Sequence, residues 1–119
     1  MDIDHEQLDG RILKINLAGR LDVAGSPEAE AKLAELTAAP NSAVIVDLSK
    51  VAFLASVGIR TLLLTAKALR SRGGRMVLLN PDASVAKVLE ISGVDMIISV
   101  FRDLNAACAA LAAEPSGDA

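Results

Sequence analysis

The residue best placed for chemistry is Ser56, which lies between a predicted strand and a predicted helix. Residues 43–48 have the continuous apolar, β-branched character of a strand buried on both faces, and a helical period begins near Ile59. Ser56 is therefore expected at the helix N-cap, where its hydroxyl can accept a hydrogen bond from a backbone N–H. A phosphate on this hydroxyl would meet the positive end of the helix dipole.

The residues around Ser56 follow a recognisable order. Asp47-Leu48-Ser49 ends the strand, Val51 and Phe53 follow, and Ser56 and Gly58-Ile59 open the helix. This segment resembles the signature of STAS domains, the anti-sigma factor antagonist family. Further matching motifs are spread over nearly the whole chain: Gly19-Arg20-Leu21-Asp22, Leu79-Asn80-Pro81 and Leu89-Glu90-Ile91-Ser92-Gly93.

The resemblance implies a phosphorylation switch at Ser56. In the family, an anti-sigma factor with kinase activity phosphorylates the equivalent serine, and the unmodified domain binds that anti-sigma factor and frees the sigma factor. Two neighbours depart from the family pattern, because Ala55 replaces the usual acidic residue and Val57 replaces a hydroxyl residue. If the kinase recognises that acidic group, Ser56 is a poor substrate and the domain binds its partner constitutively.

The helix after Ser56 has two distinct faces. Residues at helical spacing form a core stripe, and the opposite face places Val57 and Leu64 among the cations Arg60 and Lys67. Apolar residues flanked by charges on an exposed face are typical of a docking surface. With the neighbouring loops that the resemblance adds, the predicted partner-binding residues are Asp22, Ser26, Ala55, Ser56, Val57, Arg60, Leu64 and Lys67.

Composition argues against several other functions. The net charge is −3 and the chain has no Trp or Tyr, so direct nucleic-acid binding is not expected. The single histidine, His5, and the single cysteine, Cys108, lie far from Ser56 and from each other. They therefore predict neither a catalytic triad nor a metal site, and we expect no enzyme and no cofactor.

The expected location is a reducing cytoplasm. Cys108 has no internal disulfide partner, the N-terminus lacks the pattern of a secretory signal, and no apolar run reaches the roughly 20 residues of a membrane-spanning helix. The domain is expected to be a monomer or a weak homodimer without a transmembrane segment.

Turn and capping residues predict the remaining elements. Asp9-Gly10 predicts a hairpin that pairs residues 2–8 antiparallel with the alternating strand around Leu13, Ile15 and Leu17. Ser26 and Pro27 predict a helix start, and Pro40 follows the expected helix end near Ala38. The later elements are expected as a strand at 75–79 after Gly73-Gly74, a helix after Asn80-Pro81-Asp82 that stops at Gly93, a strand at 96–100, and a helix capped by Asp103.

This order predicts an α/β fold, with a mixed sheet of about five strands and about four helices. The N-terminal hairpin is antiparallel and the later strands are parallel. Residues 1–113 are expected to form one STAS domain, and residues 114–119 a disordered C-terminal tail.

Two other functions remain open. The first is a phosphorylation-independent STAS subunit of a signalling or lipid-transport complex, in which Ser56 only caps a helix. The second is a nucleotide or small-anion binding module that uses the loops around Asp22 and Ser56 and the helix N-terminus.

Overall fold

The N-terminal hairpin forms as its turn residues predict. The computed structural model describes residues 1–113, in which β1 (Asp2–Gln7) runs antiparallel to β2 (Ile12–Leu21). Gly10 in the connecting turn has a φ of +70°, a conformation that glycine adopts without steric cost. The predicted tail at 114–119 lies outside the described residues.

The sheet has five strands in the order β1-β2-β3-β4-β5. Strands β3 (Ala43–Leu54), β4 (Arg75–Leu79) and β5 (Val100–Phe101) extend it, and every pair from β2 onward is parallel. The predicted mixed sheet, with an antiparallel hairpin and later parallel strands, is confirmed. In such a sheet the helices that follow the strands all begin at the edge where the parallel strands end.

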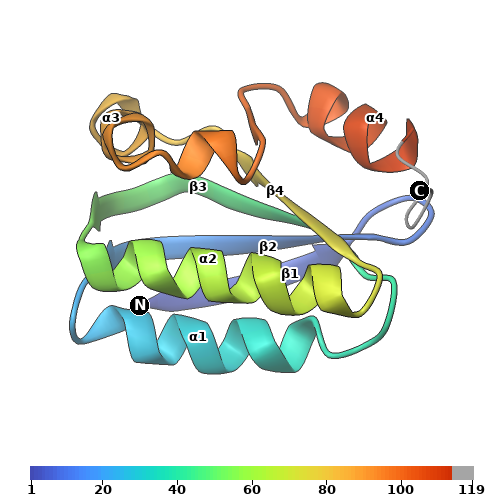
Figure 1. Cartoon of the computed structure of the whole chain (residues 1–119), viewed down its shortest axis with the longest axis horizontal. Coiled ribbons are helices and arrows are strands. Elements are labelled where there is room, and N and C mark those ends of the chain that lie inside the picture. Colours follow the sequence, from blue (N-terminus) through green and yellow to red (C-terminus); the bar gives the residue numbers. More distant parts are fainter. Residues whose placement is uncertain (114–119) are drawn as a thin grey trace.

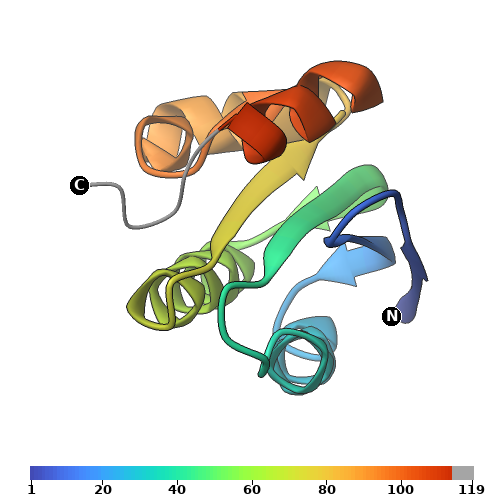
Figure 2. The same ribbon diagram turned by 90° about the vertical axis from the view of Figure 1, so that its right-hand side faces the viewer.

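Helices cover both faces of this sheet (Figures 1 and 2). Helices α1 (Gly25–Leu36) and α2 (Ser56–Ser71) lie on one face, and α3 (Ala83–Ser92) and α4 (Leu104–Ala113) lie on the other. The largest fully buried side chains come from both layers and from the sheet between them: Ile15, Leu17, Leu21, Leu33, Ile45, Leu48, Leu62, Leu69, Leu78 and Leu89.

Local capping signals were correct for four helix ends. Asp82 is the N-cap of α3 and accepts a hydrogen bond from the Val85 N–H at 2.9 Å, and Gly93 ends the same helix with a φ of +80°. The Asp103 carboxylate accepts from the Ala106 N–H at 2.9 Å at the start of α4. Gly73, with a φ of +79°, follows the end of α2.

Three element boundaries differ from the prediction. Strand β3 continues to Leu54 instead of ending at residue 48, because β2 remains paired with it up to Leu21 and Leu54. The last strand is only Val100–Phe101, since Val94–Met96 forms a 3-10 turn, η1. Helix α1 begins at Gly25 rather than after a Ser26 cap, because Asp22 holds the preceding turn.

Candidate functional site

The candidate site lies where β2 and β3 end and α2 begins. The Ala55 N–H donates a 3.0 Å hydrogen bond to the Leu21 carbonyl, which joins the end of β3 to the end of β2. Ser56 follows directly and is exposed. The parallel pairing therefore brings Ser56 near the turn that contains Asp22, although the two residues are far apart in sequence.

Ser56 is the first helical residue of α2, so the prediction that it is the N-cap is wrong by one position. The N-cap is Ala55, whose carbonyl accepts from the Gly58 N–H at 2.9 Å and from the Ile59 N–H at 3.0 Å. No side chain caps this helix end. The extension of β3 to Leu54 leaves a single residue between strand and helix, and that residue takes the cap position. Among the described residues, the Ser56 hydroxyl has no hydrogen-bond partner.

Gly58 permits the first turn of α2 to pack closely on the strand ends. A Cβ atom at this position would lie 2.7 Å from both the Cβ and the carbonyl oxygen of Leu21, and 2.8 Å from Cδ1 of Leu54. These separations are far below van der Waals contact. The glycine of the recognised motif therefore has a packing role that fixes the position of Ser56 over the sheet edge.

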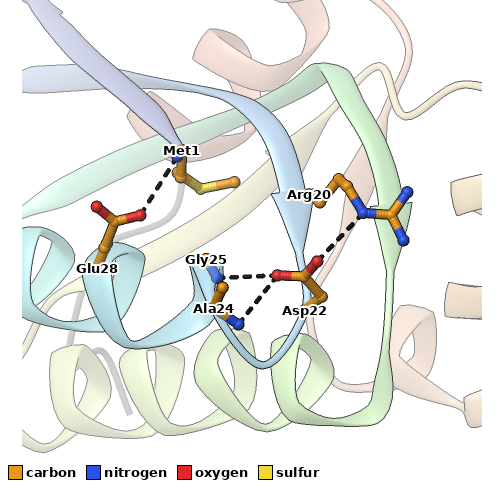
Figure 3. Close-up of polar contacts among 6 residues, drawn as sticks. All are labelled: Met1, Arg20, Asp22, Ala24, Gly25 and Glu28. Carbon is orange, nitrogen blue, oxygen red and sulfur yellow. Dashed lines mark hydrogen bonds and ion pairs between the residues drawn. The ribbon is translucent and has the colours of Figure 1, made fainter.

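Asp22 holds the turn between β2 and α1, which lies beside the start of α2 (Figure 3). Its Oδ1 accepts from the backbone N–H groups of Gly25 at 2.9 Å and Ala24 at 3.1 Å, and its Oδ2 accepts from Arg20 Nε at 3.1 Å. The hydrogen bond from Gly25, followed by that from Arg20, holds the pKa of the Asp22 carboxyl below its usual value. Asp22 thus supplies the anion that the start of α1 requires.

Ser26, which the sequence predicts as a partner contact, is buried and does not reach the surface around Ser56. Only 1% of the residue is exposed, and its buried hydroxyl has no hydrogen-bond partner among the described residues. Helix α1 has already begun at Gly25, so Ser26 faces inward from its first turn. The local Ser-Pro pattern could not distinguish an N-cap from a position one residue inside the helix.

Three exposed residues near Ser56 were not among the predicted partner contacts. Arg20 and Phe53 are paired across the ends of β2 and β3, and the Arg20 guanidinium lies 4.3 Å from the centre of the Phe53 ring. Phe53 is 41% exposed and Val23, in the turn after β2, is 81% exposed. The sequence contained a signal for Phe53, because a large apolar residue at this strand end matches the family motif.

Helix α2 has the orientation that the sequence predicts. Leu62, Ala66 and Leu69 are buried, whereas Arg60 and Lys67 are exposed on the opposite side, where 40% of Leu64 is exposed. Val57 is half-buried at the start of that side. The sequence predicts that a partner binds the surface formed by Ser56, Val57, Arg60, Leu64 and Lys67, and we call this surface the α2 docking face. Within residues 1–113, neither of its two cations has an ion-pair partner.

A separate polar cluster lies along the paired strands β1, β2 and β3. Lys14 Nζ lies 3.1 Å from Asp47 Oδ2, and the Asp47 Oδ1 accepts from the Ser49 N–H at 2.8 Å. Burial favours the neutral carboxyl, but the hydrogen bonds from Ser49 and Lys14 together hold the pKa of Asp47 below its usual value. These residues line a cleft of about 510 Å³. Asp47 therefore belongs to the cluster around Lys14, whereas Asp22 holds the turn before α1. The two carboxylates do not form a pair.

Residues 1–113 contain neither a cluster of metal ligands nor a helix that could span a membrane. In residues 1–113, no His, Cys, Asp and Glu side chains gather in a group of three or more that could hold a metal ion. Over the same residues, each helix is too short or too polar to cross a lipid bilayer. His5 is exposed on β1, and Cys108 is partly buried on α4.

The fold has clear counterparts among known proteins. A model of the family described as STAS domain matches residues 4–107. The chain is 34% identical over 110 residues to a Bordetella bronchiseptica protein described as a candidate anti-sigma factor antagonist, BtrV; the match covers 92% of this chain and 94% of that protein.

Solved structures show the same architecture. An anti-sigma factor antagonist from Mycobacterium paratuberculosis superposes with a TM-score of 0.84 at 23% identity, over 93% of each chain. The anti-sigma factor antagonist SpoIIAA in its unphosphorylated form gives 0.76 at 23% identity, over 95% of this chain and 98% of that one. The phosphorylated form of Bacillus SpoIIAA gives 0.66 at 24% identity, over 92% and 99% of the two chains.

Proposed function

The chain belongs to the STAS domain family, and from this premise we propose that it is an anti-sigma factor antagonist. In this function the unmodified domain binds an anti-sigma factor that has serine kinase activity, and the bound anti-sigma factor releases its sigma factor. The domain acts in the cytoplasm as a binding protein and not as an enzyme. The relative from Bordetella bronchiseptica, which this chain matches over 92% of its length, supports the general role.

The observation that carries the proposal is the position of Ser56 at one end of the α2 docking face. The serine is exposed, and the same face presents a 40% exposed Leu64 and the cations Arg60 and Lys67. Apolar side chains within a rim of charge suit a protein partner, because their burial stabilises the complex and the charges orient it. A kinase bound to this face would have the Ser56 hydroxyl within its interface.

Phosphorylation of Ser56 switches binding off. The kinase transfers the γ-phosphoryl group of ATP to the Ser56 Oγ, the hydroxyl proton leaves, and ADP is released. The phosphate adds about −1.5 to −2 charges at neutral pH. At the start of α2 the helix dipole favours this charge, so the fold is retained while a partner surface fitted to a neutral hydroxyl is repelled.

Paired substitutions at Ser56 test the switch. Ser56→Asp should weaken binding to the cognate anti-sigma factor by at least about tenfold, or roughly 1.4 kcal/mol, because it places a charge in the interface. Ser56→Ala should bind as the unmodified chain does. Calorimetry would give both affinities, and circular dichroism would check that both variants are folded. Equal affinities for the two variants would contradict the switch.

A mass measurement tests the modification itself. Incubation of the unmodified chain with the same anti-sigma factor and ATP should add one phosphate to the intact mass, and Ser56→Ala should abolish the addition. A phosphate added to the Ser56→Ala variant would assign the modification to another residue.

A second candidate function is a STAS subunit that binds a partner without phosphorylation. Ala55 favours it, because the N-cap of α2 carries no carboxylate for a kinase to recognise. The same two experiments separate the candidates. If the chain binds the anti-sigma factor but gains no phosphate during incubation with it and ATP, the second function is supported and the first is contradicted.

A further inference from the structure

We propose that phosphorylated Ser56 is clamped by Arg60, so that the phosphate also removes a cation from the α2 docking face. This inference rests on the proposed function, since it takes Ser56 as the modified residue. In this form of the switch, phosphorylation adds negative charge to the face and at the same time takes away a cation that a partner could contact.

The helix geometry places the two side chains together. Ser56 and Arg60 both lie in α2, four residues apart, and both are exposed. Residues at this spacing are neighbours on one helix face, with about 5–6 Å between their Cβ atoms. The order is the favourable one, because an anion located N-terminal to a cation at this spacing agrees with the helix dipole.

Arg60 is available for this contact. Its guanidinium makes no hydrogen bond or ion pair with another side chain or carbonyl of residues 1–113. Arg20, the other arginine near the start of α2, is already held by the Asp22 carboxylate at 3.1 Å and by the Phe53 ring at 4.3 Å. Ala55 contributes no carboxylate that would compete with a phosphate for the Arg60 guanidinium.

The clamp affects what a partner finds on the face. A guanidinium can present two parallel N–H groups to phosphate oxygens, which makes the contact stronger and more directional than one formed by an ammonium group. With Arg60 turned toward the phosphate, Lys67 is the remaining cation of the α2 docking face. An acidic group of the partner that pairs with Arg60 in the unmodified complex would lose its contact and meet the phosphate instead.

A titration of the phosphate tests the clamp without any partner or kinase. The full chain is produced with phosphoserine incorporated at position 56 during translation, and the phosphate signal is followed by ³¹P NMR from pH 4 to 8. An adjacent guanidinium favours the dianion and lowers the second pKa of the phosphate, which is ordinarily about 6. Arg60→Gln should therefore raise that second pKa by roughly 0.3 to 0.5, a twofold to threefold tighter binding of the proton.

Lys67→Gln is the matched control, because it removes the same charge from the same helix face at a greater distance from Ser56. It should move the phosphate titration much less than Arg60→Gln does. Equal shifts in the two variants, or no shift in Arg60→Gln, would overturn the clamp. This outcome is distinguishable from failure of the proposed function, which is decided by the binding and mass experiments on the chain without phosphoserine.

Discussion

At the scale of single residues, Ala55 sets the start of α2 apart from the other helix starts. The carboxylates of Asp22, Asp82 and Asp103 accept hydrogen bonds from backbone N–H groups at the starts of α1, α3 and α4. Helix α2 has neither a side-chain cap nor an acidic residue in its first turn. Among the described helices, α2 is therefore the one whose N-terminal partial charge has no nearby carboxylate to offset it, which lowers the stability of the unmodified domain.

Ala55→Asp should stabilise the unmodified domain by about 1 kcal/mol, because an aspartate at an N-cap can accept from first-turn N–H groups and complements the dipole. The backbone of Ala55, with φ −94° and ψ 172°, already has the extended conformation of an N-cap. Urea denaturation measures the free energy of unfolding. Ala24→Asp is the control and should gain less, because Asp22 already accepts from the Ala24 and Gly25 N–H groups. Unchanged or lower stability of Ala55→Asp would show that the side chain at this position cannot reach the helix start.

At the scale of the element, α2 combines a structural side and an exposed side. Leu62 is 0% exposed within the core, and Leu64, two residues on, is 40% exposed. Residues two apart on a helix point in widely different directions, so substitutions at these two leucines separate folding from binding. The close approach of Gly58 to Leu21 fixes how this helix sits on the sheet, and therefore which side faces solvent.

Leu64→Glu should reduce partner affinity at least about tenfold while changing the free energy of unfolding by less than about 0.5 kcal/mol. The added carboxylate would disturb an apolar contact that lies outside the core. Thermal unfolding and calorimetry with the anti-sigma factor measure the two quantities. Leu62→Ala is the contrasting control and should cost about 2–5 kcal/mol of stability, since it leaves a cavity in the core. A large loss of melting temperature in Leu64→Glu would mean that Leu64 supports the fold.

At the scale of the whole molecule, three carboxylates in different parts of the chain make the free energy of unfolding depend on pH. Hydrogen bonds hold the pKa values of Asp22 and Asp82 below their usual value, and hydrogen bonds outweigh burial to do the same for Asp47. A depressed folded-state pKa means that the unfolded chain binds more protons at acid pH. The resulting stabilisation is complete above the ordinary aspartate pKa of about 3.9 and is lost as pH falls through the lower folded-state values.

The domain should therefore lose stability as pH falls from about 5 toward 2, and the double variant Asp22→Asn and Asp47→Asn should show a shallower loss. The variant should be less stable than the parent at pH 7, and the difference should shrink in acid as the parent's carboxylates become protonated. Urea denaturation across this pH range gives both curves. Ser56→Ala should follow the parent curve. Parallel curves for the parent and the double variant would contradict a contribution from these two groups.

Local chemistry in the sequence was sufficient for much of the fold. The Asp9-Gly10 hairpin, the strand at 75–79, the Asp82 cap and the Gly93 stop each depend on a few adjacent residues. The exposed side of α2 could be predicted as well, because helical periodicity alone separates Leu64 from the buried stripe. The position of Ser56 close to the helix start followed from the same patterns and from the family motif.

Only the tertiary structure decided the details that define the site. Pairing with β2 extends β3 to Leu54, which makes Ala55 the N-cap and moves Ser56 into the helix. The same pairing brings Arg20 over Phe53, from segments more than thirty residues apart in the chain. Strand length and cross-strand contacts depend on hydrogen bonds to a distant segment, which no local pattern encodes. Periodicity and the motif determined that a serine would lie at the start of a helix with one exposed side, whereas strand pairing determined which residues surround that serine.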